Sequence, residues 1–336
     1  MGFPAVHPRR REARSYPRLQ GGEAMLALIG RRLLVTLPLL LFVTLLVNLM
    51  SLLVPGDPAV QIAGENATHE QIELTRQRLG LDRPWHERYL DWLAGAARGD
   101  LGNSVFTNDS VSQLLQERLP VTLALTLSAL VFAALVGVPA GILAALRRNR
   151  WQDSLIRGVA TIGIAMPGYW LGLLLLMVFA IQLGLFPTIG YTPLTENPAA
   201  WLHGIVLPTV ALGAPAAAEV ARQLRRSMID TLQQDFVRTA TAKGLRYWMV
   251  LGKHALTHAA NPVVTVLATQ MALLLGAAVI IEKVFVIPGI GELAVNSVIN
   301  KDLTIVQGIV VVTTLVIVVT NLLADLAHAW LSPRTR

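Results

Sequence analysis

The 336-residue chain contains no cysteine, which excludes disulfide bonds, cysteine-ligated zinc and thiol catalysis. Charged residues are also scarce, at 15% of the chain, and aromatic residues make up only 6%. Hydrophobic residues account for 54%, and the mean hydropathy is +0.55. This composition is typical of a protein with several membrane spans. At about 20 apolar residues per crossing, the length accommodates about six spans and one extramembrane insert.

Sequence motifs for catalysis are missing as well. Gly252-Lys253 is not a phosphate-binding loop, because Tyr247 stands where the first glycine belongs and His254 follows the lysine. No Gly-x-Ser-x-Gly occurs, and His69-Glu70 lacks the second histidine of a zinc-protease helix. We therefore expect no catalytic residue, no cofactor and no metal site, and any ATP hydrolysis must come from another polypeptide.

Few ionisable residues fall within the apolar segments. Glu219 lies one helical turn from Arg222, and Glu282 precedes Lys283 at the end of an apolar run. For these residues, and for Asp325, we expect placement at the membrane interface. A secondary transporter or channel, the main rival interpretation, should show ionisable residues deep in its spans or paired inverted repeats. A sensory or scaffold membrane protein would need a signalling domain, and none is recognisable.

The net charge of +7 is distributed in a way that predicts topology. Residues 1–24 are rich in Arg, Pro and Gly, which predicts a disordered cytoplasmic extension, with Met25 as an alternative start. The first span is expected from Leu33 to Val54, and both termini, including a tail at 333–336, are expected in the cytoplasm. Residues 57–118 hold ten acidic and six basic side chains, a balance typical of the outer side.

The segment that follows the first span should be helical but not membrane-spanning. Thr68 and Gln71 form a capping-box pattern for a helix that ends at Gly80. Two amphipathic stripes follow, each typical of a surface helix. They consist of Trp85, Tyr89, Trp92 and Leu93, and of Val111, Leu114, Leu115 and Leu119. The aromatic stripe could serve as an interfacial anchor or as a face that stacks on substrate.

Five further apolar segments complete the expected set of six spans. They are Val121–Leu146, Leu155–Leu185, about Ile205–Val220, Pro262–Ile281 and Thr304–Leu323. Met166-Pro167 should kink the second of these, and small residues in the third favour close helix packing. Met166, Pro167 and the mid-membrane Gln270 are candidates for a pathway or gate, although Gln270 could equally hydrogen-bond a neighbouring helix.

The segment 222–261 is a polar interlude between two spans. It contains seven basic and two acidic residues, which predicts a cytoplasmic loop. At 100° per residue, Phe236, Ala240 and Gly244 share one face of a short helix, while Arg238 and Thr241 point elsewhere. Such a helix could dock on another protein, or it could be a solvated connector with a glycine stop.

These residues carry a resemblance to a known family. Phe236-Val-Arg-Thr-Ala-Thr-Ala-Lys-Gly244-Leu245, followed by Lys253-His-Ala-Leu256 and Asn261-Pro-Val-Val, resembles the cytoplasmic signature loop of ABC-importer permeases of the DppB/OppB type. The wider superfamily pattern is Glu-Ala-Ala, three residues, then Gly. Ala240 and Gly244 match it, whereas Arg238 and Thr239 replace the Glu and the first Ala. Pro55-Gly-Asp-Pro58, Leu79–Pro84, Gly99–Ser104 and Glu282–Gly291 are also similar to that family.

The resemblance implies an all-α type I ABC-importer permease with six transmembrane helices. In that arrangement 25–118 would be the first span plus the extracytoplasmic helical insert, 119–332 the permease domain, and 222–261 its coupling loop. The residues implied in coupling to an ATPase are Phe236, Arg238, Thr239, Ala240, Lys243 and Gly244. The implied partners are a second homologous permease, two ATPases and an extracytoplasmic substrate-binding protein. The implied cargo is di- or oligopeptide, with nickel-chelate, glutathione or another small solute as alternatives, and the implied location is the bacterial plasma membrane.

Overall fold

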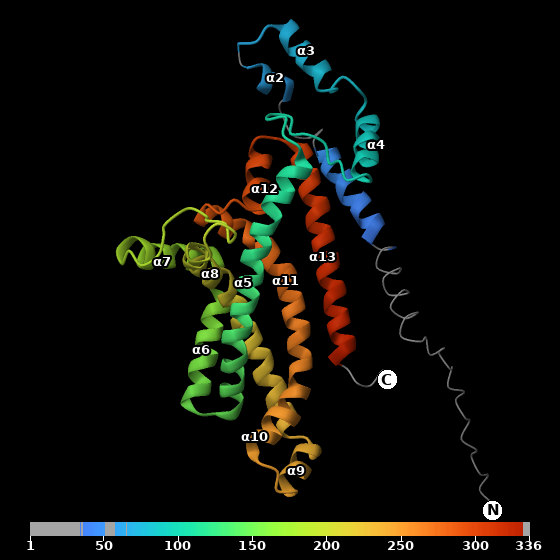
Figure 1. Cartoon of the computed structure of the whole chain (residues 1–336). Coiled ribbons are helices and arrows are strands. Elements are labelled where there is room, and N and C mark those ends of the chain that lie inside the picture. The colour runs from blue at the N-terminus through green and yellow to red at the C-terminus, as the bar shows by residue number, and fades with distance from the viewer. Residues whose placement is uncertain (1–33, 35, 51–57, 65, 332–336) are drawn as a thin grey trace, which may run out of the picture. The chain divides into compact units, whose positions relative to one another are not determined.

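The computed structural model describes residues 34, 36–50, 58–64 and 66–331 (Figure 1). The N-terminal extension, most of the Pro55–Pro58 turn and the tail at 333–336 lie outside these residues. The chain divides into two compact units, Met1–Leu39 and Leu40–Arg336, and all the helices labelled below belong to the second. An apolar helix, Thr36–Met50, covers the middle of the first expected span, whose two ends lie largely outside the described residues.

The described residues beyond this helix are predominantly helical, as expected. Helices before the bundle are α2 (Pro58–Ala63), α3 (His69–Arg78) and α4 (Trp85–Ala96). The bundle and its connections comprise α5 (Val111–Leu146), α6 (Trp151–Ala165), α7 (Gly168–Leu175), the π-helix η1 (Leu176–Gln182), α8 (Pro198–Leu232), α9 (Asp235–Ala242), α10 (Tyr247–Met249), the π-helix η2 (Val250–Leu256), α11 (Thr257–Phe285), α12 (Ile290–Ile299) and α13 (Leu303–Leu331). One isolated antiparallel bridge, between Asn103 and Ser110, interrupts the helical pattern.

The helical insert follows its sequence signals closely. The capping box at α3 is confirmed, because the Thr68 hydroxyl accepts from the Gln71 amide and the Gln71 side chain accepts from the Thr68 amide. In α4 the Tyr89 hydroxyl contacts the Thr44 hydroxyl at 3.0 Å, and the Trp92 indole donates to the Leu101 carbonyl at 3.1 Å. The aromatic stripe therefore packs largely on the chain's own residues.

Four helices among the described residues are long and apolar enough to cross a membrane, and the bent pair α6 with α7–η1 adds a fifth. The stripe that begins at Val111 does not form a separate helix, because α5 continues from it through Pro120 into the apolar segment. Similarly, α8 extends beyond both ends of the expected Ile205–Val220 span. Asn197 caps it at one end, and it continues through the arginines to Leu232.

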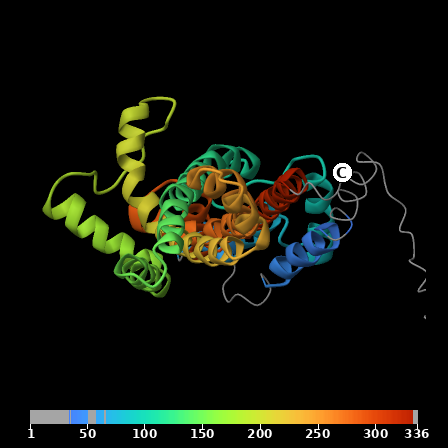
Figure 2. The same cartoon turned by 90° about the horizontal axis from the view of Figure 1, so that it is seen from below.

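The third expected span is broken rather than kinked. Between Ala165 and Gly168 the chain turns by 102°, so that α7 leaves the bundle and projects sideways (Figures 1 and 2). Met166 adopts an extended conformation, φ −82° and ψ 123°, because a residue before proline is disfavoured in the α region. Pro167 also lacks the amide hydrogen that would continue the helix.

The two longest helices, α5 and α8, pack along a seam of small residues. On α5 the seam contains Ala129, Ala133, Gly137 and Gly141, and α8 contributes Gly213, Ala217 and Ala221. A Cβ at Gly141 would lie 2.8 Å from the Ala221 carbonyl, and one at Gly213 would lie 2.8 Å from the Ala129 carbonyl. Spacings of four residues place these positions on one helix face and let the two backbones touch. The close packing expected from the small residues of α8 is confirmed.

Candidate functional site

The polar interlude folds into a compact helical module at the end of the bundle opposite α12 (Figure 1). It is not an extended loop, since α8 runs to Leu232 and α9 begins at Asp235. After α9, Gly244 takes a left-handed conformation with φ +74°, which reverses the chain toward α10 and η2. Glycine suits this position because it has no Cβ to clash with the following carbonyl.

The apolar face of α9 points into the protein. Val237 is 7% exposed and Ala240 9% exposed, and both pack against Val250 with Leu232 and Phe236 at the edge. The Phe236 ring lies 4.9 Å from the His258 ring of α11. The expectation that Phe236, Ala240 and Gly244 together form an outward docking face is therefore corrected. Ala240 is covered by the chain's own η2, because a short amphipathic helix must bury its apolar side somewhere.

The surface that remains open is polar on α9 and apolar just after it. Arg238 has a side chain 74% exposed, and its ion pair with Asp235 is long, at 3.8 Å. Thr239, Lys243 and Gly244 are exposed as well. Beyond Gly244 come four exposed apolar side chains that sequence reasoning overlooked, Leu245, Tyr247, Trp248 and Met249. An aromatic pair inside a cationic loop was the signal that could have identified them.

The second candidate site lies where α7 leaves the bundle. A Cβ at Gly168 would lie 3.2 Å from the Ala211 carbonyl of α8, so the first turn of α7 sits directly on that helix. Pro215, four residues after Ala211, has no amide hydrogen to donate to this carbonyl. The break in one helix and the proline in the next thus meet at one place.

Gln270 belongs to the same place. A cavity of about 210 Å³ is lined by Gly168 and Tyr169 of α7, by Pro215 of α8 and by Gln270 of α11, together with apolar side chains of α8 and α11. The structure therefore brings Gln270 next to the residues that directly follow Met166 and Pro167. Among the described residues, the Gln270 amide has no hydrogen-bond partner, so it does not tie two helices together.

A third cluster joins three helices at the end of the bundle near α12. The Glu282 carboxylate accepts hydrogen bonds from the Thr122 hydroxyl at 2.7 Å, the Gly291 amide at 2.7 Å and the Glu292 amide at 3.1 Å. The two amides belong to the first turn of α12, where the helix dipole also favours an anion. A Cβ at Gly289 would collide with the carboxylate, so glycine is required there.

Glu282, for which we expected placement at the membrane interface, is buried within this cluster, with a side chain that is 0% exposed. Its charge is held by donors of the chain itself, which makes the burial tolerable. Lys283 does stay exposed and donates to the Asn296 side chain at 2.9 Å. Nearby, Arg118 and Glu292 form an ion pair at 2.6 Å. The Thr122 donor is 160 residues away in the sequence, whereas the Gly291 and Glu292 amides follow Glu282 closely, and Pro288-Gly-Ile-Gly291 was the local signal for them.

Comparison with known proteins places this architecture in one family. Residues 137–336 match the family described as binding-protein-dependent transport system inner membrane component, and residues 25–126 match the N-terminal part of such membrane components. The chain therefore belongs to the family of binding-protein-dependent transport system inner membrane components. Members of this class are permease subunits and not catalytic enzymes.

Two relatives and one solved structure show in more detail which proteins the chain is similar to. The chain is 38% identical over 312 residues to "Putative peptide transport system permease protein BAB2_1050" of Brucella abortus (strain 2308), covering 93% of this chain and 99% of that protein. It is 40% identical over 312 residues to "Glutathione transport system permease protein GsiC" of Escherichia coli (strain K12), with the same coverage of 93% and 99%. A chain of the inward-facing MetNI methionine ABC transporter superposes with a TM-score of 0.55 at 18% identity, covering 66% of this chain and 97% of that one. The type I importer fold expected from the sequence is confirmed.

Proposed function

We propose that the chain is the permease subunit of an ABC importer that carries di- or oligopeptides across the bacterial plasma membrane. It would form the pathway with a second homologous permease, receive cargo from an extracytoplasmic binding protein and be driven by two ATPase subunits. Both termini would lie in the cytoplasm. The resemblance of the signature loop and the 38% identity to a protein named as a peptide transport permease support this proposal.

The observation that carries the proposal is the open surface around α9. We define the docking surface as Arg238, Thr239, Lys243, Leu245, Tyr247, Trp248 and Met249. Its apolar part is unusual in a water-facing segment and typical of the centre of a protein interface, where Trp, Tyr and Arg are enriched. The inward packing of Val237 and Ala240 fixes this surface to the bundle. An ATPase that pulled on it would therefore move α8 and η2 as well.

A matched pair of tryptophan substitutions tests the docking surface. Trp248 is 74% exposed, and Trp151, at the start of α6 and outside the surface, is 70% exposed. We expect Trp248→Ala to lose most ATPase co-purification, because truncation of an interface tryptophan costs about 2 kcal/mol or more, or roughly 30-fold in affinity. Trp151→Ala should retain wild-type co-purification. Equal retention by both variants would contradict docking at this surface.

Gly244 needs two substitutions to separate bulk from backbone strain. No atom lies within 4 Å of a Cβ added there, so Gly244→Trp would project into the docking surface. Its φ of +74° also strains most side chains, whereas Asn tolerates that region better. We expect Gly244→Asn to retain transport and Gly244→Trp to abolish it while the chain still inserts. Equal loss in both variants would indicate that the turn conformation, not steric access, governs coupling.

Pairing with a second permease is supported by the projecting arm of α7 and η1. Its exposed side chains are almost all apolar and include Trp170, Leu173, Met177 and Ile181. One face of the arm packs on α8 and α11 through Gly172 and Ala180, and these exposed side chains lie on the rest of its surface. Such a surface fits a second hydrophobic subunit in the membrane. The Gln270 cavity at its base would then lie beside the pathway and change shape as α8 moves, without covalent chemistry in this chain.

Cargo is best identified by uptake into vesicles that contain the complete complex. Dipeptides, longer peptides and glutathione should be compared at equal concentration, because one relative is named a glutathione permease. Preferential uptake of peptides, dependent on ATP and on the binding protein, is the expected result. Preferential uptake of glutathione would redirect the assignment of cargo without changing the permease fold.

A further inference from the structure

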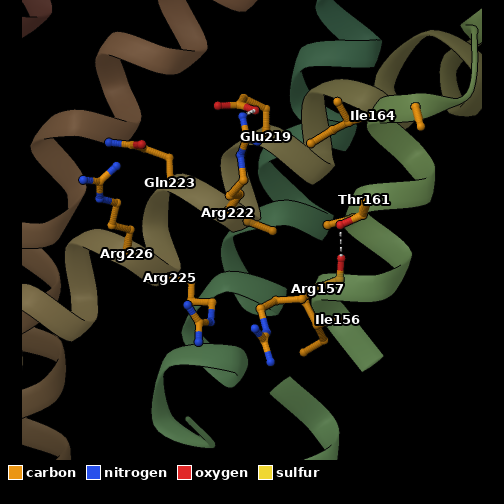
Figure 3. Close-up of a pocket in the computed structure, with 12 residues that line it drawn as sticks. Ile156, Arg157, Thr161, Ile164, Glu219, Arg222, Gln223, Arg225 and Arg226 are labelled. Atoms are coloured by element: carbon orange, nitrogen blue, oxygen red, sulfur yellow. Dashed lines mark hydrogen bonds and ion pairs between the residues drawn. The ribbon is translucent and has the colours of Figure 1, made fainter. Parts of the chain in front are cut away.

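A second cavity, of about 800 Å³, lies between α6 and α8 (Figure 3). Its walls differ in chemistry. Ile156, Ala160 and Ile164 line it from α6, whereas α8 contributes Arg222, Arg225 and Arg226 together with Glu219. One further arginine, Arg157, joins from α6. The cavity is therefore apolar on one side and cationic on the other, and neither catalysis nor docking of the α9 surface uses it.

Two of the four arginines are neutralised within the chain. Arg225 donates from two nitrogens to Asp153, at 2.6 and 2.8 Å, and this carboxylate is 0% exposed. Arg222 forms an ion pair with Glu219 (Figure 3). The pair formed by Asp153 and Arg225 is fixed in place, because the Asn149 amide also donates to Asp153 at 3.0 Å.

The other two arginines leave the cavity with surplus positive charge. Arg157 forms a longer ion pair with the same Asp153 carboxylate, at 3.5 Å, and donates to the Ser154 hydroxyl at 3.3 Å. Arg226 has no carboxylate partner within the part of the chain that the structure describes. Four arginines thus face two carboxylates, a surplus of two positive charges. Guanidinium groups match phosphate oxygens in geometry and charge.

The position of the cavity suits an amphiphile. Arg157 lies about 9 Å along α6 from its first residue, and Ile164 lies about 10 Å further, at the rise of 1.5 Å per residue. Ala160 and Ile164 therefore lie deeper along the helix than Arg157. The outer face of the same helix exposes Leu155, Val159 and Ile162, which would contact hydrocarbon in a membrane.

We propose that this cavity binds the phosphate headgroup of an anionic phospholipid from the cytoplasmic leaflet. Arg157 and Arg226 hold the phosphate, and the wall of Ile156, Ala160 and Ile164 accommodates the start of an acyl chain. A free phosphate ion would leave that apolar wall unused, whereas a phospholipid occupies both sides. Basic cavities between spans on the cytoplasmic side commonly take such headgroups. The proposal rests on the proposed function for its orientation, since α6 must begin in the cytoplasm.

Lipid retention by the purified complex provides the direct test. The complex is prepared in vesicles of phosphatidylcholine with one quarter phosphatidylglycerol, extracted, and analysed by native mass spectrometry. The test variant is Arg157→Gln with Arg226→Gln. The control, Arg148→Gln with Arg150→Gln, removes the same charge from exposed arginines of the neighbouring turn outside the cavity. We expect retained phosphatidylglycerol to fall about fivefold per arginine, or about 25-fold in the test variant, and to stay at wild-type level in the control.

Further measurements distinguish a bound phospholipid from other ligands of the cavity. Glu219→Gln removes one carboxylate and should increase retention, which gives a readout even where the double variant assembles poorly. Displacement of the lipid by millimolar inorganic phosphate would reveal a soluble-anion site, and displacement by peptide cargo would reveal a part of the pathway. Either result, or equal retention in test and control variants, would overturn the proposal. Co-purification of the ATPase is measured in parallel, so failure of the lipid site is distinguishable from failure of the proposed function.

Discussion

Gly137 allows the packing of α5 on α8 to be tested with a single added methyl group. A Cβ at this position would lie 2.6 Å from the Ala217 carbonyl oxygen and 2.8 Å from the Val220 Cβ. Neither atom can rotate away, so the helices must separate by about 0.8 Å to restore ordinary contact. Overpacking of this kind costs about 2–3 kcal/mol, and the better helix propensity of alanine returns about 1 kcal/mol. Gly137→Ala should therefore destabilise the protein by about 1–2 kcal/mol.

Gly158 in α6 is the matched control, because it is exposed and a Cβ there would meet no atom within 4 Å. Gly158→Ala should be neutral or stabilising by up to about 1 kcal/mol. Thermal unfolding of both purified variants in one detergent gives the comparison, and we expect apparent melting temperatures to shift in opposite directions. A Gly137→Ala variant that melts at or above the wild-type temperature would refute the direct backbone contact between α5 and α8.

Three further outcomes are expected. Glu282→Gln should destabilise the protein by about 2–4 kcal/mol in thermal unfolding, because an amide cannot accept all three hydrogen bonds of the carboxylate, whereas Lys283→Gln should change little. Asp153→Asn should lower the stability of the protein to unfolding by about 2–3 kcal/mol, because it leaves Arg225 without its carboxylate partner. Adding Arg225→Gln to Asp153→Asn should restore part of this stability, and strictly additive effects of the two substitutions would contradict the ion pair. A cysteine at Asn66 should react with an impermeant thiol reagent from outside and one at Gln234 should not, and the reverse labelling would overturn the orientation.

The apolar segments were predictable because hydrophobicity and length alone determine them. The ends of α5 and α8 were not, since a helix continues into water wherever its sequence tolerates it. The 102° turn at Met166 illustrates a different limit. A proline in an apolar run indicates a bend, but its size depends on the Ala211 carbonyl and Gly168, which are far apart in the sequence. The sequence thus predicted where the helix is interrupted, but not the angle between the two helices.

Candidate site residues were predictable as a segment and less so as a surface. The spacing of Phe236 and Ala240 correctly placed them on one face of a short helix, but spacing does not say whether that face turns toward the protein or away from it. Val250, which covers Ala240, lies beyond the glycine turn, where no periodicity connects it to α9. The burial of Glu282 was not predicted for the same reason, because Thr122, which donates a hydrogen bond to it, is 160 residues away in the sequence.

The course of α8 suggests how the proposed sites could communicate. This helix is 35 residues long, lies against α5 along the small-residue seam, borders the Gln270 cavity at Pro215 and carries the arginines of the larger cavity. Only Gln233 and Gln234 separate its end from α9. A displacement of the docking surface would therefore reach α8 directly, while the tight contacts at Gly137 and Gly213 resist bending of its middle. We expect α8 to tilt as a unit from the turn before α9, with the freed Ala211 carbonyl beside Pro215 as the place where that tilt alters the cavity.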